Sequence, residues 1–221
     1  MNNHLQQLNQ NTNPTYMGLA IIPGYTMIDD YLAKIKVVLD KAITEHPRTF
    51  VVRFDLHLPI QPNCVDMPNV YDSTVISRFV DSFKAHVKYD LLAKKREGKR
   101  VHDCTIRYIW TKEKNESQQA HYHVALLLNH DTYFTLGNYD GSSNNLVSKI
   151  YSSWASALGI ECFSISRYVH FPQDIPTYFV NINSSTYISD YNRVFYRLSY
   201  FAKLETKVFG TKEKNFGYSL R

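Results

Sequence analysis

Two histidines separated by one residue, His121 and His123, open the apolar stretch HYHVALLLN. This stretch is typical of a β-strand, whose side chains alternate between two faces, so we expect both imidazoles on one face and Tyr122 on the other. Two imidazole nitrogens at this spacing suit a divalent transition-metal ion. Paired histidines also occur at the rims of sheets without a metal, so the pair indicates a site only if a third ligand lies nearby.

A carboxylate follows the preceding apolar stretch. Glu113 comes directly after IRYIWTK, eight residues before His121. If the two stretches pair as an antiparallel hairpin, Glu113 at the end of the first strand lies beside His121 at the start of the second. Three such ligands leave open positions for water and a substrate oxygen. Glu116 is an alternative ligand, but Glu113 is closer to the rigid end of the strand.

A second group of reactive side chains lies in YRLSYFAK, residues 196–203. On a helix, Tyr196 and Tyr200 are spaced i, i+4 and Tyr200 and Lys203 are spaced i, i+3, so all three share a face. A phenol with a pKa of about 10 needs a nearby cation or a metal-polarised phosphate to act as a nucleophile. Lys203 is a candidate for that cation. In the alternative interpretation the tyrosines pack on a sheet and Lys203 is solvated.

Hydrophobic periodicity and turn residues predict the elements that position these groups. Apolar residues that recur every three or four positions predict helices over residues 26–45, 73–97, 146–158 and 190–207. Strands are predicted in β-rich stretches, over 49–59, 104–112, 121–129, 162–171 and 177–183, the last two as separate strands or as a hairpin. This order predicts an α+β fold with a central antiparallel β-sheet flanked by helices. We expect a polar flexible tail (1–14), one domain (15–207) and a basic C-terminal tail (208–221).

Composition excludes several classes of protein. The three cysteines are far apart and form no CxxC pair, which argues against a zinc ribbon or a disulfide scaffold. No apolar run approaches the roughly 20 residues that cross a bilayer, and the N-terminus lacks the apolar stretch of a signal peptide. There is no GxGxxG or P-loop motif. We therefore expect a cytoplasmic protein without a nucleotide site of the GxGxxG or P-loop type.

The histidine and tyrosine motifs together resemble those of the HUH endonucleases, which combine a His-hydrophobic-His motif with a helical Tyr-x-x-Lys. RFDLHLP, residues 53–59, stands where the first motif strand of that family is expected. The run from WTKE through HYHVALLLN to RLSYFAK is similar to the inovirus-type replication proteins of filamentous phages and prophages. In replication initiators the tyrosine follows the histidines, as Tyr200 follows His123 here, whereas in relaxases it precedes them.

The resemblance implies a central sheet of the RRM-like type and a metal-dependent nickase. Glu113, His121 and His123 would hold Mg²⁺ or Mn²⁺. Tyr200, assisted by Lys203, would attack the scissile phosphate of single-stranded DNA. The products would be a 5′-phosphotyrosine and a free 3′-hydroxyl, which primes rolling-circle replication of a phage or another mobile element in a bacterial host cell.

The same resemblance gives expectations for three further residues. Tyr196 has the Tyr-x-x-x-Tyr spacing of two-tyrosine initiators and is either a second nucleophile or a packing residue. Asp55 and His57 share one face of their predicted strand, where they would support the metal ligands or flank the groove.

Charge clustering fits a DNA substrate. The chain has a net charge of +5, and residues 191–221 contain seven basic and two acidic residues. Because this cluster adjoins Tyr200, we expect Arg193, Arg197 and Lys207 to contact DNA. The expected partners are single-stranded DNA or an origin hairpin, a separate helicase and the host replication machinery, with no membrane partner.

Three alternatives remain open from the sequence. A DNA-binding regulator could keep the fold without nuclease activity. A single-tyrosine HUH transposase would share the order of the motifs. A metal hydrolase without a covalent step would cleave DNA even after Tyr200→Phe.

Overall fold

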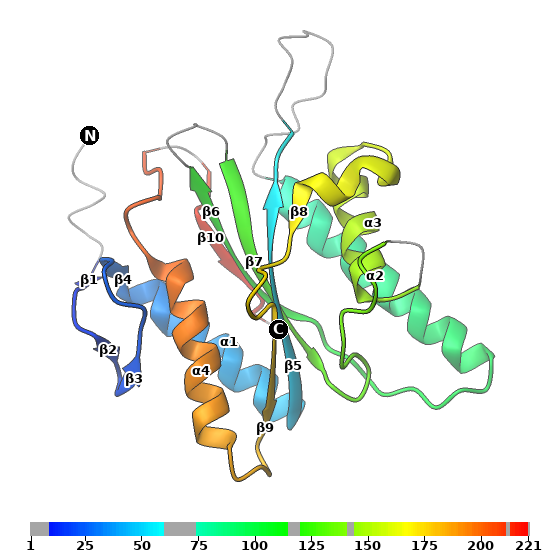
Figure 1. Cartoon of the computed structure of the whole chain (residues 1–221), viewed down its shortest axis with the longest axis horizontal. Coiled ribbons are helices and arrows are strands. Elements are labelled where there is room, and N and C mark those ends of the chain that lie inside the picture. Colours follow the sequence, from blue (N-terminus) through cyan, green and yellow to red (C-terminus); the bar gives the residue numbers. More distant parts are fainter. Residues whose placement is uncertain (1–8, 60–73, 115–119, 141–143, 211–212, 221) are drawn as a thin grey trace, which may run out of the picture.

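A six-stranded antiparallel sheet forms the middle of the protein in the computed structural model, which describes residues 9–59, 74–114, 120–140, 144–210 and 213–220. The helices are α1 (Asp29–Glu45), α2 (Val75–Arg96), α3 (Leu146–Leu158) and α4 (Tyr187–Ser199). The strands, in spatial order, are β10 (Phe216–Tyr218), β6 (Arg107–Lys114), β7 (Ala120–Asn129), β5 (Arg48–His57) and β8 (Val169–His170), and β9 (Thr177–Asn181) also pairs with β5. The predicted α+β fold, a central antiparallel sheet flanked by helices, is confirmed (Figure 1).

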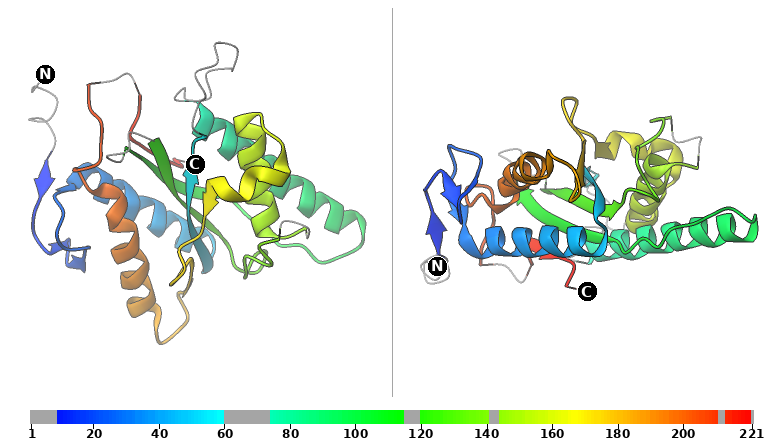
Figure 2. Two further views of the ribbon diagram at one scale, coloured as in Figure 1. Left: turned by 45° about the horizontal axis from the view of Figure 1, so that its top comes forward. Right: turned by 90° about the horizontal axis from the view of Figure 1, so that it is seen from below.

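The helices form a layer on each face of the sheet. Helices α1 and α4 lie on one side of it and α2 and α3 on the other (Figures 1 and 2). Alternation along β5 explains this arrangement, because Val52 and Phe54 pack in the α2–α3 core whereas Val51 packs in the α1–α4 core. Two separate hydrophobic cores therefore hold the sheet.

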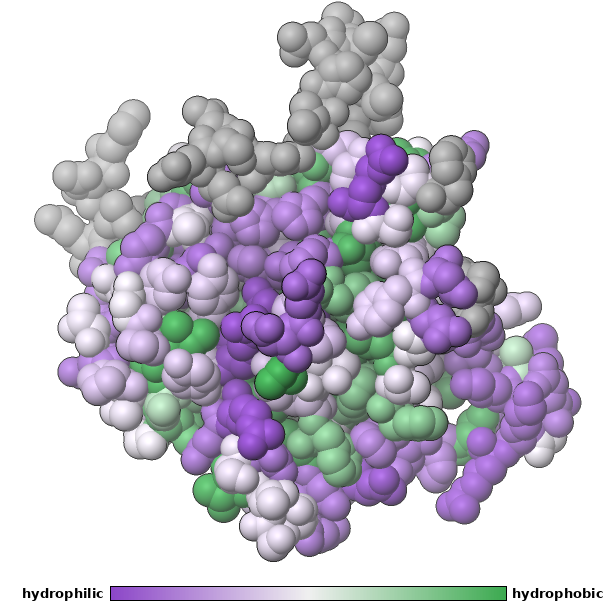
Figure 3. Space-filling model, in the orientation of Figure 1, coloured by the Kyte–Doolittle hydropathy of each residue, from purple (hydrophilic) through white to green (hydrophobic). Residues whose placement is uncertain are grey.

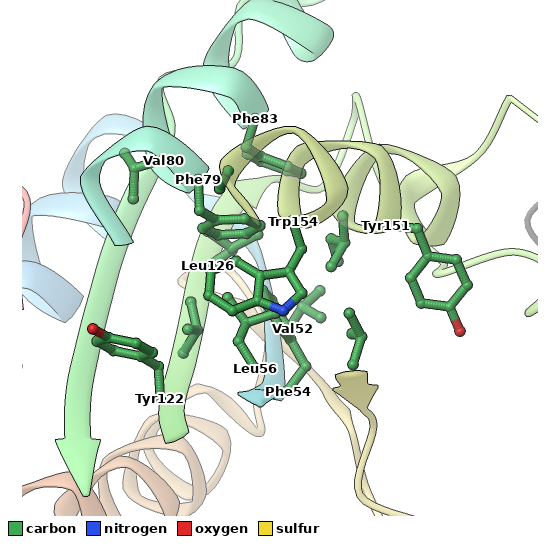
Figure 4. Packing of buried hydrophobic residues seen from close by; sticks show 14 of the residues in the cluster. Val52, Phe54, Leu56, Phe79, Val80, Phe83, Tyr122, Leu126, Tyr151 and Trp154 are labelled. Atoms are coloured by element: carbon green, nitrogen blue, oxygen red, sulfur yellow. The ribbon is translucent and has the colours of Figure 1, made fainter. Parts of the chain in front are cut away.

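Large aromatic side chains fill the α2–α3 core. Trp154 of α3 is fully buried, with its ring centroid 6.1 Å from that of Phe79 and 6.3 Å from that of Tyr122 (Figure 4). Its indole N–H donates a hydrogen bond to the main-chain oxygen of His57 at 3.1 Å. This layer therefore anchors the end of β5 as well as covering the sheet.

Helix α3 matches its predicted range because its ends carry strong local signals. The Asn145 side chain accepts a hydrogen bond from the Ser148 N–H at 2.9 Å, and the Ser148 hydroxyl accepts one from the Asn145 N–H at 3.0 Å. Gly159 ends the helix in the left-handed conformation, with a φ of 69°.

Helix α1 starts later than predicted. Met27 and Ile28 form β4 (Met27–Ile28), which pairs with β1 (Gln10–Asn11), so the helix begins at Asp29 and not at residue 26. A second small hairpin joins β2 (Thr15–Tyr16) to β3 (Leu19–Ala20). The predicted apolar face of α1 is buried, as expected; it consists of Leu32, Ile35, Val38, Leu39 and Ile43.

The prediction of a strand over residues 162–171 is wrong for most of its length. Residues Cys162–Tyr168 form a 3₁₀ helix, η2, and only Val169–His170 form a strand. Ile165 and Val169 are buried four residues apart, whereas Ser166 and Arg167 between them are exposed, so burial here does not follow the two-residue period of a strand. Strands β8 and β9 do not form a hairpin with each other; each pairs with a different part of β5.

The two expected tails are partly structured. Within the described part of the predicted tail 1–14, β1 pairs with β4 and Asn11 is buried. Within the predicted tail 208–221, β10 adds an edge strand to β6 because Phe216 packs against Tyr31, with ring centroids 4.3 Å apart. Among the described residues, no helix is both long and apolar enough to cross a membrane.

Candidate metal and tyrosine site

The hairpin of β6 and β7 brings three candidate metal ligands together. Glu113 is directly opposite His121, as predicted, and Thr111 is opposite His123. All three candidate ligands are buried, with 2 to 6 % of their surface exposed. Each offers a ligand atom within 4.8 Å of the others, so the group could hold a metal ion.

The ligand atoms converge on one point. The Nε2 atoms of His121 and His123 are 3.2 Å apart, and Nε2 of His123 is 3.2 Å from Oε2 of Glu113. Two imidazole nitrogens and one carboxylate oxygen fit a divalent cation that keeps open positions for other ligands. The other predicted ligand, Glu116, lies outside the described residues.

Asp55 of β5 orients one of the imidazoles. It is opposite His123 in the β5–β7 pairing, and its Oδ1 atom is 2.6 Å from Nδ1 of His123. A proton on Nδ1 that is donated to Asp55 leaves the lone pair of Nε2 free for a metal. Burial alone raises the pKa of Asp55, but the hydrogen bond to His123 and the charges of His123, Arg53 and His121 together outweigh burial and lower that pKa.

The second imidazole is held uncharged. Burial, followed by the charges of His123 and His57, lowers the pKa of His121 to about 4. The ring of His57 stacks on that of His121, with centroids 5.3 Å apart. The neutral ring is the form that binds metals. The sequence left open whether Asp55 and His57 support the ligands or flank the groove; Asp55 contacts His123, and His57 stacks on His121.

Two lysines neutralise Glu113. Nζ of Lys203 is 2.8 Å from Oε2 of Glu113, and Nζ of Lys207 is 2.8 Å from Oε1. Burial alone raises the pKa of Glu113, but His123 and the two lysines hold that pKa well below its usual range. The carboxylate therefore stays ionised, which is the form that binds a cation.

Lys207, which the sequence suggested as a DNA contact, is buried. Its side chain is buried against Glu113, and burial lowers its pKa to about 8 although Glu113 opposes the shift. A lysine in this position does not present its ammonium group to DNA at the surface. Its contribution is to the electrostatics of the candidate metal site.

Tyr200 and Lys203 meet, but not as parts of one long helix. The predicted helix 190–207 ends at Ser199, Tyr200 lies in the 3₁₀ turn η3 (Tyr200–Ala202), and Lys203 is extended. Lys203 forms a main-chain bridge with Met27, which replaces further helical hydrogen bonds. Its ammonium group donates a hydrogen bond to the Tyr200 hydroxyl.

Aromatic rings and one arginine surround the half-buried Tyr200. Its ring centroid is 5.4 Å from that of His123 and 5.7 Å from that of Tyr25. The guanidinium carbon of Arg53 lies 5.8 Å from the same centroid. The tyrosine is therefore in contact with the histidine cluster.

The remaining predicted residues are on α4. Tyr196 lies one turn before Tyr200 and is 39 % exposed. Arg193 is exposed and Arg197 is half-buried.

Two residues beside Tyr200, Arg53 and Tyr25, were not predicted from the sequence. Arg53 shares the face of β5 that carries Asp55 and His57, so strand periodicity alone was a usable signal for it.

The comparisons with known proteins agree on one family. The model of the YagK/YfjJ C-terminal domain matches residues 12–219. The chain is 39 % identical over 194 residues to the Escherichia coli K12 protein named "Uncharacterized protein YagK", covering 86 % of this chain and 92 % of that protein. It is 34 % identical over 194 residues to "Uncharacterized protein YfjJ" of the same strain, covering 86 % of this chain and 93 % of that protein. No solved structure matches the chain.

Proposed function

The chain belongs to the YagK/YfjJ C-terminal domain family, and we propose that this member is a metal-dependent endonuclease that nicks and rejoins single-stranded DNA. The family name carries no activity, so the proposal rests on the site. Its biological role in this proposal is to initiate rolling-circle replication of a phage or another mobile element. Strand separation would fall to a separate helicase, and synthesis to the host replication machinery.

One observation carries the proposal. The ammonium group of Lys203 donates a hydrogen bond to the Tyr200 hydroxyl. The same ammonium group lies 2.8 Å from Oε2 of Glu113. The arrangement supports the proposal, because phosphoryl transfer needs a nucleophile, a cation and a metal-ligand set in one place.

The residues have distinct tasks in the proposed reaction. The Tyr200 oxygen attacks phosphorus and loses its proton, while the bond from phosphorus to the 3′ oxygen breaks and that oxygen takes up a proton. Lys203 donates a hydrogen bond to the phenol oxygen and so stabilises the charge that develops there. A divalent cation, Mg²⁺ or Mn²⁺, held by Glu113, His121 and His123 would polarise the scissile phosphate.

The covalent link keeps the energy of the broken phosphodiester, so the reverse reaction rejoins the ends without a nucleotide cofactor. Tyr196 is exposed one helical turn away from Tyr200 and is available as a second nucleophile. Arg193 is exposed on the same helix and is suited to contact the DNA backbone.

The test is a denaturing gel of the full chain with 3′-labelled single-stranded oligonucleotides and Mn²⁺. The oligonucleotides include hairpins from the genetic element that encodes the protein. We expect a labelled band at the mass of the protein, because the 3′ fragment stays bound to Tyr200. The band should disappear in Tyr200→Phe, in His123→Ala and with a chelator.

Matched variants make the result specific. Tyr89→Phe and His86→Ala change the same residue types on α2, in the other helix layer, and should give the wild-type band. Cleavage that survives Tyr200→Phe would indicate a hydrolase, and binding without any product across the hairpin set would indicate a regulator. An unchanged second cleavage in Tyr196→Phe would limit the nucleophile to Tyr200.

A further inference from the structure

Arg53 is a buried arginine beside the candidate nucleophile. It is 6 % exposed, and its Nη2 atom lies 3.5 Å from Oδ1 of Asp55. Its Nε atom is also buried but has no hydrogen-bond partner among the described residues. Buried guanidinium N–H groups are normally paired, so this donor needs a partner that is not part of the chain described here.

Arg197 of α4 also has a buried guanidinium N–H group without a partner. It is half-buried, and its Nε atom is buried without a hydrogen-bond partner in the described ranges. Burial, with a further contribution from the charge of Arg197, lowers the pKa of Arg53, although Asp55 opposes the shift. An anion that contacts both guanidinium groups would pair with each of these charges.

The cluster of charged side chains around Tyr200 carries a net positive charge, which favours an anion. Arg53 lies beside Asp55, and Lys203 and Lys207 contact Glu113. The charge of Arg197 acts on Arg53 and that of Glu205 acts on Lys207, so four cationic side chains stand against three carboxylates. No carboxylate in the described parts of the chain pairs with Arg197. A divalent cation on the His-His-Glu group would increase the positive excess further.

We propose that Arg53 and Arg197 form a subsite that binds a phosphodiester group of the single-stranded DNA next to Tyr200. The proposal deepens the proposed function and rests on it for the identity of the ligand. Guanidinium groups match the geometry of phosphate oxygens and can donate two parallel hydrogen bonds. The guanidinium carbon of Arg53 lies 5.8 Å from the centre of the Tyr200 ring, so a phosphate bound by Arg53 is near the candidate nucleophile.

The test measures binding, so it does not depend on cleavage. A fluorescent single-stranded oligonucleotide is titrated with the full chain in chelator, over a series of salt concentrations. We expect Arg53→Gln and Arg197→Gln each to weaken binding by about tenfold, and to reduce the slope of log K against log salt by about 0.7, the value for one lost phosphate contact on a single strand. The double variant should lose little more than either single variant, because both arginines hold one phosphate.

A neutral methylphosphonate moved along the oligonucleotide locates the phosphate. At one position the methylphosphonate should weaken binding of the oligonucleotide to the wild type. At the same position it should not weaken binding to Arg197→Gln any further. Arg167→Gln, an exposed arginine of η2, is the matched control and should bind as the wild type does. If Arg53→Gln fails to fold, Arg197→Gln and the methylphosphonate series decide the question alone.

The two proposals fail in different ways. Wild-type affinity and salt slope in Arg197→Gln, or losses that simply multiply in the double variant, would overturn the shared subsite even if the tyrosine adduct forms. Loss of binding in both variants with no adduct from the wild type would retain the subsite and reject the nickase.

Discussion

At the residue scale, each candidate ligand has a partner that fixes its charge or its orientation. Asp55 orients His123, burial keeps His121 neutral, and two lysines keep Glu113 ionised. The histidines and Glu113 were predictable because strand periodicity and antiparallel pairing place them without any tertiary information. Strand periodicity also places Arg53 on the same face of β5 as Asp55. The role of Lys207 was not predictable, because it depends on the packing of the segment after α4 against β6.

Asp55→Asn should weaken metal binding. The amide keeps the size of the side chain but removes the negative charge that holds the proton on Nδ1 of His123. Loss of such a partner costs about 10- to 100-fold in metal affinity. Isothermal titration of the full chain with Mn²⁺ at neutral pH measures the effect.

Asp81→Asn, an exposed change on α2, is the control for Asp55→Asn and should leave the Mn²⁺ affinity unchanged. Equal affinities in the wild type and Asp55→Asn would show that the Asp55–His123 contact does not tune the ligand.

At the element scale, local signals predicted those elements whose ends are set by their own residues. Helix α3 has both a capping box and a terminal glycine, and its range was correct. The end of α4 was not predictable, because the bridge between Lys203 and Met27 joins segments far apart in the sequence. The 3₁₀ helix η2 was missed because its packing against α3, and not its strand-like composition, decides its conformation.

A buried charge network joins α2 to α3 and the preceding loop. Asp90 accepts hydrogen bonds from Tyr133 at 2.8 Å and Lys94 at 3.0 Å, and lies 3.5 Å from the buried Lys149. Burial alone raises the pKa of Asp90, but the bonds from Lys94 and Tyr133 and the charge of Lys149 lower it. The carboxylate therefore contributes stability above its unfolded pKa of about 3.9, and that stability is lost as the pH falls through the lower folded value.

Asp90→Asn should destabilise the protein at pH 7 by of order 3 kcal/mol, because it leaves Lys149 buried without its anionic partner. The difference from the wild type should shrink as the pH is lowered below 4. Urea unfolding over a pH series tests this, with Asp81→Asn on the same helix as control. A difference that stays constant with pH would contradict the assignment.

At the scale of the whole molecule, the beginning of the chain supports the part that follows α4. The main-chain N–H of Leu204 donates to the oxygen of Thr26 at 2.8 Å, next to the Met27–Lys203 bridge. Strand β1 in turn pairs with β4, and the N–H of Asp29 donates to the oxygen of Asn9.

At the other side of the molecule the end of α2, with Lys94, Lys95 and Arg96, projects as a hydrophilic surface (Figure 3).

A chain that begins at residue 15 should be less stable than one that begins at residue 9. The deletion removes β1, its hydrogen bonds and the buried Asn11, and at about 1 kcal/mol per hydrogen bond we expect a loss of about 1–2 kcal/mol. For a chain of this size that lowers Tm by about 3–6 °C. Calorimetry of the two chains measures it, and equal Tm values would show that residues 9–14 behave as a dispensable tail.

The alternation of side chains along β7 also limits how this protein can change over evolutionary time. His121 and His123 face the candidate site while Tyr122 fills the opposite core. Deletion or insertion of a single residue inside β7 would exchange the two faces, with an imidazole in the apolar core and a phenol among the ligands. Length variation among descendants should therefore collect between β6 and β7 and be absent from the strands.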